Sequence, residues 1–424
     1  MIIYSKFDIL DTKEATNSLI LAAINEVFYM DELRKKAREF RSTGDYKEAV
    51  GIYIKLYVPN CDRWIAWEYA DSLKKCNDID TAINICKDTY ESSKDFKYIN
   101  DLYSWLLFEK YFKSIKDSYQ ADEIAHLYKT ALLVTELVTQ NTNSPYENIL
   151  IQTIKILSKH SLIQWDKVLE LIYKLDLSLV SDKPLKYNKH EKEIEYQSNR
   201  EMIYAYKTKA LFELNQYEDC IKNCNEAFSV INKFHHDNDT WINLRKAKSI
   251  TALGDIDKGI VLLLDISIKK IHWDLYYEVA KMFVMKNDTN NAVLYFCKAA
   301  ITNDPPKMKV TLYYEMATLY YGTGNIENAR LFSYYAYKIR VSEKWNIPTN
   351  LNNLLYKTNG LDKNLEVDNK KIIDLCVFEI YSILGKKQGI VSKVQPHGKT
   401  GFISWGKDSY YFKMSSVINM RSIK

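Results

Sequence analysis

The chain has 424 residues, of which 47% are hydrophobic and 27% are charged, with a formal net charge of +5. This length and apolar content are enough for a sizeable core and exclude a disordered chain. Only 12 glycines and 7 prolines are present, which favours helices joined by short turns. The sequence has no run of about 18 apolar residues, so no membrane partner is expected.

Residues 1–30 open the chain with apolar residues interrupted by charges such as Lys6, Asp8 and Glu14. This segment lacks the basic start, the apolar run and the small-residue cleavage site of a signal peptide, and we expect an N-terminal helical cap. Seven cysteines, an odd number, are scattered along the chain and fit a reducing compartment better than a disulfide framework. A cytoplasmic location is therefore predicted, and a bacterial source is also expected.

A pattern of small and large residues recurs through residues 31–340. The first copy has Ala37, Phe40, Gly44, Tyr46, Ala49 and Tyr53, and the second follows as Ala70, Leu73, Asn77, Ile79, Ala82 and Cys86. Four more copies place their turn residue at Asn215, Gly254, Asn287 and Gly324. The pattern resembles the tetratricopeptide repeat, which implies helix pairs that bury their apolar faces by stacking on neighbouring pairs. The predicted fold is mainly α, a tetratricopeptide-like α-solenoid with a small C-terminal β domain.

Three segments depart from the repeat. Residues 95–200 keep helical apolar spacing, but the small-residue positions drift, so degenerate repeats are expected. The polar segment 181–200 is predicted to be a loop or hinge. Residues 341–385 are interpreted as an irregular connection over 341–365 followed by a docking helix over 369–384.

Cations and rings alternate along the groove that the resemblance implies. Proteins of this family usually bind through the concave face of the first helix in each repeat, and the matching positions hold Arg34, Arg38, Arg41, Trp64, Trp67, Lys74, Lys209, Phe212, Trp241, Lys248, Tyr277, Lys281, Tyr314 and Tyr321. This composition predicts a protein or peptide partner, with an acidic peptide or a nucleic-acid strand as the ligand. The alternative is a solvated helix face with rings packed on their neighbours.

No catalytic or metal-binding motif emerges from the sequence. Nucleophile-elbow, phosphate-loop, zinc-protease and paired-carboxylate patterns are all missing, so no enzyme and no cofactor is predicted. Cys220 and Cys224, followed by His235 and His236, have a faint metal-ligand spacing. Both cysteines occupy small-residue positions of a repeat, which favours packing in the core, and no metal site is predicted.

The last segment, residues 386–424, has a β pattern. Gly389–Val391, Gly401–Ile403 and Tyr410–Val417 resemble three strands of a cold-shock domain. The resemblance implies a partial OB-type sheet that stacks bases on exposed rings. Lys393 stands where the family has Trp, Thr400 replaces a Phe, and only three of five strands are recognisable. The alternative is a β appendage that only packs against the helices.

The tail also holds the positive charge of the chain. Residues 386–424 contain eight lysines and arginines against Asp408 alone, a net charge of +7 compared with +5 for the whole chain. A local basic excess is typical of a polyanion binder. The predicted nucleic-acid-binding residues are Lys393, Lys399, Phe402, Trp405, Tyr411 and Lys413, with Trp405 placed in the turn after the second strand.

Together these features predict a non-enzymatic adaptor that binds single-stranded RNA or DNA through the tail and a protein through the repeat groove. Two alternatives remain open at this point. One is a pure protein-interaction scaffold whose tail is a structural cap, and the other is a peptide-sensing bacterial regulator built from helical repeats.

Overall fold

The computed structural model describes residues 26–59, 61–159, 163–189, 192–361, 365–385 and 389–417. It divides into two compact units, Met1–Ile242 and Asn243–Lys424. Most of the predicted N-terminal cap, residues 1–25, lies outside the described residues, and a helix over residues 26–43 crosses the predicted boundary at residue 30.

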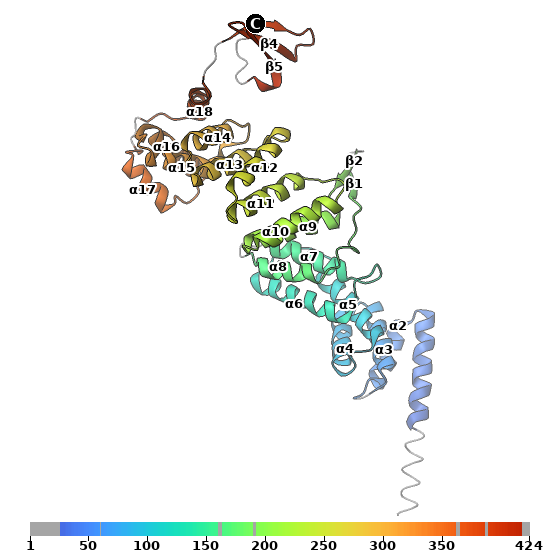
Figure 1. The fold of residues 1–424 in the computed structure, drawn as a ribbon. Coiled ribbons are helices and arrows are strands. Elements are labelled where there is room, and N and C mark those ends of the chain that lie inside the picture. Colours follow the sequence, from blue (N-terminus) through green and yellow to red (C-terminus); the bar gives the residue numbers. More distant parts are fainter. Residues whose placement is uncertain are drawn as a thin grey trace, which may run out of the picture. The chain divides into compact units, whose positions relative to one another are not determined.

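The first unit is a succession of helices in which each helix contacts the next (Figure 1). After the helix over 26–43 come α2 (Tyr46–Leu56), α3 (Arg63–Lys75), α4 (Ile79–Ser92), α5 (Lys97–Tyr111), α6 (Ala121–Leu137), α7 (Tyr146–Lys159), α8 (Trp165–Tyr173), α9 (Asn199–Glu213) and α10 (Tyr217–Val230). Helices therefore occupy most of residues 95–200, the region in which degenerate repeats were predicted. One continuous apolar core joins them, from Ala37 to Ile242.

The segment predicted as a loop or hinge, 181–200, instead contains a β-hairpin. Strand β1 (Leu185–Lys189) pairs antiparallel with β2 (Lys192–Tyr196), with Leu185 opposite Tyr196. The polar composition concealed the strands, because a two-stranded ribbon needs little apolar surface of its own. Ser198 then caps α9 by accepting a hydrogen bond from the Glu201 amide.

The second unit continues the helical pattern and ends in a sheet. Its helices are α11 (Asn238–Ala252), which contains the division between the units, α12 (Ile256–Lys269), α13 (Trp273–Met285), α14 (Thr289–Ala300), the 3-10 turn η1 (Pro306–Lys309), α15 (Val310–Gly322), α16 (Ile326–Ser342), α17 (Thr349–Lys357) and α18 (Asn369–Leu384). The strands are β3 (Ile390–Val394), β4 (Thr400–Trp405) and β5 (Asp408–Lys413), followed by the 3-10 turn η2 (Met414–Ser416).

Two of these helices, α17 and α18, lie in the segment predicted as a connection and docking helix, residues 341–385. Helix α18 has the predicted bounds and packs on α14, where Cys297 and Cys376 are both fully buried. The stretch predicted as irregular contains α17, whose Leu351, Leu354 and Leu355 are buried. The leucine spacing of i, i+3 and i+4 is helical, and the prediction overlooked it.

The same turn joins the two helices of each of the six predicted repeat copies. Its central residue has a positive φ in all six: Gly44, Asn77, Asn215, Gly254, Asn287 and Gly324. In each copy the next residue donates its amide to the carbonyl five residues earlier, as Asp288 does to Phe283. That next residue then caps the second helix in four copies: Asp78, Asp255, Asp288 and Asn325. The repeat is thus confirmed in its turn chemistry.

Small residues set the spacing between paired helices. Ala49, Ala82, Ala292 and Ala329 are fully buried at equivalent positions of the second helix. Gly259 occupies this position in its own repeat, and a Cβ there would lie 2.1 Å from Thr251 Oγ1 and 3.1 Å from the Ala247 carbonyl. The protein is therefore mainly α, built from tetratricopeptide-like helix pairs, with a small C-terminal sheet.

Candidate nucleic-acid interface and repeat groove

The C-terminal strands form an antiparallel meander in the order β3-β4-β5. Lys393 lies opposite Phe402, and Phe402 lies opposite Tyr411, so one residue from each strand forms a row across the sheet. The rings of Phe402 and Tyr411 contact edge-to-face with centroids 5.6 Å apart. Because residues directly opposite one another in a sheet share a face, two rings and one cation belong to a single surface.

A β-bulge determines the face of the sheet on which Lys393 lies. The register between β3 and β4 shifts between Val391 and Lys393, so Val391 pairs with Ile403 whereas Lys393 pairs with Phe402. In a regular strand, residues two apart point to the same side, and Lys393 would share the face of Val391. The extra residue redirects Lys393 to the face of the rings. We call the surface formed by Lys393, Thr400, Phe402, Tyr411 and Lys413 the ring face.

The opposite surface is more apolar. Val391, Ile403 and Tyr410 form one row, and Gly401 pairs with Phe412. A Cβ on Gly401 would lie 2.7 Å from the Phe412 ring, so only glycine fits beside that ring. The described strands do not close into a barrel, and the resemblance to a cold-shock domain is therefore not confirmed beyond a three-stranded sheet.

Two predicted residues lie away from the ring face. Trp405 is the last residue of β4, opposite Asp408, and not in the following turn as predicted. It shares strand parity with Ile403 and therefore belongs to the opposite surface. The two-residue loop after it contains Gly406 at a φ of 58°, typical of a tight hairpin. Lys399 immediately precedes β4, and its carbonyl accepts the Met414 amide.

The lysines of the ring face are available for a ligand. Neither Lys393 nor Lys413 forms an ion pair with another described residue. Both are exposed, and Tyr411 is 55% exposed. Thr400 lies opposite Lys413 on the face of Phe402, so the second cation stands two residues along the same strands from the rings.

The arginines at the start of the predicted groove are already paired. Arg34 contacts Asp62 at 2.8 Å and Glu68 at 3.2 Å, Arg38 contacts Glu68 at 2.6 Å, and Arg41 contacts Asp71 at 2.7 Å. Glu68 is buried and also accepts from the Tyr53 hydroxyl at 3.2 Å. These guanidinium groups are paired with acidic side chains of the next repeat, of which Glu68 is buried, so they do not support an electropositive groove in the first repeats.

The predicted rings of these repeats pack on their neighbours. Trp64 contacts Trp67, Phe96 and Tyr98, with ring centroids 4.6–6.1 Å apart. The Arg41 guanidinium lies 5.1 Å from the Trp67 ring. Lys74 is half-buried on α3. The Lys209 ammonium lies 5.2 Å from the Trp165 ring. The alternative weighed from the sequence, rings packed on their neighbours, describes this part of the chain.

In the second unit, two predicted groove residues meet at a hollow between α13 and α15. Lys281 and Tyr314 line it together with Val284, Met285, Phe296, Glu315, Thr318, Leu319, Gly322 and Thr323, and its volume is about 580 Å³. The sequence analysis did not predict this apolar lining. Val284 and Met285, at the end of α13, are 39% and 58% exposed. An apolar hollow of this size is typical of a binding groove.

Charge around this hollow is compensated within the unit. Lys281 contacts Glu278 at 3.4 Å and lies 5.0 Å from the Tyr277 ring, and Lys248 contacts Glu278 at 3.0 Å. Tyr277 is buried, and burial together with a hydrogen bond to Glu315 raises the pKa of its hydroxyl. Trp241 is half-buried, and it belongs to the first unit. The geometry therefore suits an apolar ligand better than the predicted acidic one.

The cysteines and His235, singled out by their spacing in the sequence, contact different partners. Cys220 and Cys224 are fully buried with sulfurs 4.0 Å apart, and their sulfurs contact backbone carbonyls. His235 instead contacts the buried carboxylate of Glu201, with Nδ1 2.8 Å from Oε2. The described residues contain no cluster of three metal-ligating side chains. None of the described helices has both the length and the apolar character to cross a membrane.

A family model matches only part of the chain. A family model described as a domain of unknown function, DUF7017, matches residues 240–375, which begin beside the division between the two units. No match to a curated protein was found.

Solved structures of helical-repeat proteins resemble the chain at low identity. A tetratricopeptide repeat protein from Parabacteroides merdae is 13% identical, with 67% of this chain and 96% of that chain covered and a TM-score of 0.27. A human IFIT1 dimer with m7Gppp-AAAA is 12% identical, with 89% and 86% covered and a TM-score of 0.37. The assignment of helical repeats depends on the turns and core described above and not on these likenesses.

Proposed function

We propose that this protein is a non-enzymatic adaptor whose C-terminal sheet binds single-stranded nucleic acid, with RNA preferred over DNA. The observation that supports it is the row of Lys393, Phe402 and Tyr411 across three strands, with Lys413 two residues further along. Exposed rings stack on bases of any sequence, and lysines pair with the phosphates that link them. Binding on this surface is therefore expected to be sequence-tolerant and sensitive to salt.

Ultraviolet crosslinking of the full chain to a single-stranded oligouridine tests the proposal. Rings that stack on bases form adducts, so peptides from the complex should carry uridine on Phe402 and Tyr411. Tyr410 and Trp405 lie on the opposite surface and serve as internal controls. Adducts confined to the helices, or equal labelling of Tyr410 and Tyr411, would count against the ring face.

The hollow between α13 and α15 supports a second role for the adaptor, the capture of an apolar peptide segment. Its lining brings Met285, Phe296 and Leu319 to one concave surface, and the nearby cation Lys281 is paired with Glu278. A protein partner would therefore insert apolar side chains here, whereas the predicted acidic ligand finds no uncompensated cation at this hollow.

A pair of threonines on α15 tests this role. Thr318 lines the hollow, whereas Thr311 is exposed on the same helix and does not line it. We expect peptides selected on the full chain to be rich in apolar residues. Thr318→Lys should weaken their binding by about tenfold or more, because it places a long charged side chain among the apolar side chains of the hollow. Thr311→Lys should leave the affinity unchanged. Equal effects of both substitutions would place the peptide elsewhere.

A further inference from the structure

A second hollow, in the first unit, carries an excess of positive charge. It has a volume of about 500 Å³ and lies between residues 115–119, the start of α6 and the last turns of α7. This volume is in the range of small-molecule sites. It is distinct from the apolar hollow between α13 and α15 and contains none of the residues predicted from the sequence.

Two lysines of α7 line this hollow one helical turn apart. Lys155 is half-buried and Lys159 is exposed, and neither forms an ion pair with a described residue. Burial lowers the pKa of Lys155, and the neighbouring charge of Lys159 lowers it further. Like charges at this spacing repel each other weakly, so an anion bound between them would stabilise the pair.

An unsatisfied amide lies in the same wall. The side-chain Oε1 of Gln152 is buried and has no hydrogen-bond partner, although the residue lines the hollow. A buried acceptor without a donor is costly to the folded chain. The wall beside the lysine pair therefore contains one polar atom that the described residues do not satisfy.

The remaining charges of the hollow leave the lysine pair uncompensated. Lys116 also lines it, but its ammonium contacts the Glu123 carboxylate at 2.5 Å. Asp117 also lines it, but this carboxylate is exposed and forms no ion pair with either lysine. Ile115, Ile124 and Ile156 supply an apolar wall, and the Tyr119 hydroxyl accepts the Lys116 amide, which fixes the connection.

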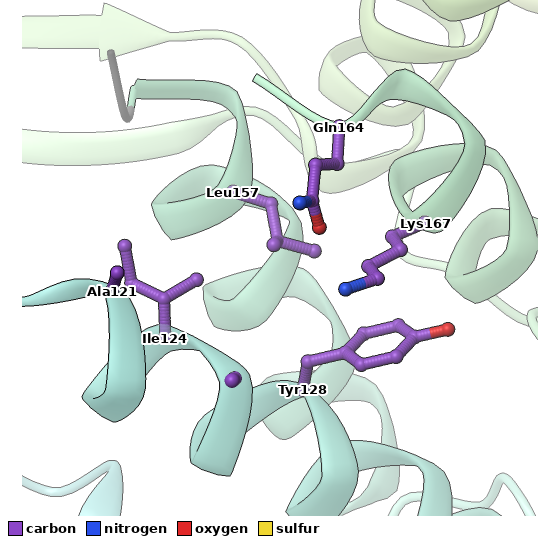
Figure 2. A pocket seen from close by; sticks show the side chains of 7 residues that line it. Ala121, Ile124, Tyr128, Leu157, Gln164 and Lys167 are labelled. Atoms are coloured by element: carbon purple, nitrogen blue, oxygen red, sulfur yellow. The ribbon is translucent and has the colours of Figure 1, made fainter. Parts of the chain in front are cut away.

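A smaller neighbouring hollow contains a lysine whose ammonium group has a partner within the chain. It shares Ile124 and has a volume of about 100 Å³, too small for more than a few waters. Figure 2 shows the Lys167 side chain extending toward the Tyr128 ring from across this hollow, and the ammonium lies 4.9 Å from the ring centroid. The Tyr128 hydroxyl in turn donates to Glu170. Lys155 has no comparable partner among the described residues.

We propose that the hollow beside α7 binds a small anion with an apolar body, either a phosphate ester or a carboxylate. The anionic group would lie between the ammonium groups of Lys155 and Lys159, and the apolar body would contact Ile115, Ile124 and Ile156.

Calorimetric titration of the full chain with phenyl phosphate and with benzoate tests the proposal and separates the two anion classes. We expect saturable binding of one of them, and no binding of the neutral benzyl alcohol. Lys155→Met should weaken the binding by about tenfold or more, because a charge-assisted hydrogen bond is lost. Lys129→Met, at an exposed lysine of α6 outside the hollow, is the matched control and should change the affinity less than about twofold.

Thermal unfolding distinguishes a binding lysine from a structural one. Removing one of two repelling cations should leave Lys155→Met at least as stable as the natural chain, whereas loss of a structural lysine would lower its melting temperature. The proposal would be overturned by a less stable Lys155→Met variant, by binding that Lys155→Met and Lys129→Met weaken equally, or by no binding of either anion at millimolar concentration.

Discussion

Replacing Lys309 by Met is expected to destabilise the second unit by about 3 kcal/mol, the largest effect of a single substitution that we predict. Lys309 ends η1 and is 2% exposed. Its ammonium donates to the Ala300 and Thr302 carbonyls, both at 2.8 Å, and to Thr302 Oγ1 at 3.3 Å. Because Ala300 is the last residue of α14, the lysine caps the negative end of that helix. Methionine would fill the space but leave these oxygens unsatisfied.

Lys307→Met is the matched control for this prediction. Lys307 lies in the same 3-10 turn, is exposed, and contacts Glu343 at 3.3 Å across the surface. A surface ion pair contributes at most about 1 kcal/mol. Hydrogen exchange should therefore show faster exchange of the α14 and α15 amides in Lys309→Met only. Similar exchange in both variants would contradict a structural role for the buried ammonium.

The pH dependence of this contribution follows from burial. Burial lowers the pKa of Lys309 below its ordinary value of 10.5, so the ammonium is less favourable in the folded chain than in the unfolded chain. The unfolded chain therefore binds more protons between the lowered pKa and 10.5, and the stability contributed by this group rises with pH through that interval.

The helical repeats could be predicted from the sequence because their turns demand particular residues. A positive φ favours glycine or asparagine, and Gly44, Asn77 and Asn287 meet this preference at the expected spacing. The alanines that let paired helices approach closely are equally restricted. These requirements are local to each repeat, which is why a single sequence reveals them.

The chemistry of the groove could not be read from the same positions, because the partners of its cations lie in another repeat. Arg34 and Glu68 are 34 residues apart, close to one repeat length. A search for acids one repeat after each arginine would have found this pair. The hollow between α13 and α15 offers a weaker signal, since apolar residues such as Val284 and Met285 at a helix end also occur in buried cores.

The C-terminal sheet, too, could be predicted from the sequence only in part. The spacing of glycines and rings predicts three strands, but the bulge between Val391 and Lys393 has no signature in the sequence. Without it, strand alternation separates Lys393 from Phe402. The prediction for Trp405 was wrong for a different reason. It grouped this ring with Phe402 and Tyr411, but strand alternation places Trp405 on the opposite surface of the sheet.

Tyr411→Ala is expected to weaken single-strand binding by about fivefold to 150-fold, because stacking on one ring contributes about 1–3 kcal/mol per base. Tyr411 lies beside Phe402 on the ring face and is 55% exposed, so its ring is available to a base. Lys393 and Lys413 remain in this variant, and we expect the residual binding to keep its dependence on salt.

The neighbouring tyrosine provides the control. Tyr410 precedes Tyr411 in β5, is 44% exposed, and lies opposite Ile403 on the other surface. Both substitutions remove the same side chain from the same strand, so a general loss of the sheet would affect both variants alike. Circular dichroism and thermal unfolding of the two full-length variants establish that the comparison concerns binding and not folding.

The most direct test of the ring face is therefore the affinity of Tyr411→Ala and Tyr410→Ala for a single-stranded oligouridine at one fixed salt concentration. The account predicts a loss of at least about fivefold for Tyr411→Ala and an affinity within about twofold of the natural chain for Tyr410→Ala. Equal losses in the two variants, or a loss only in Tyr410→Ala, would contradict it.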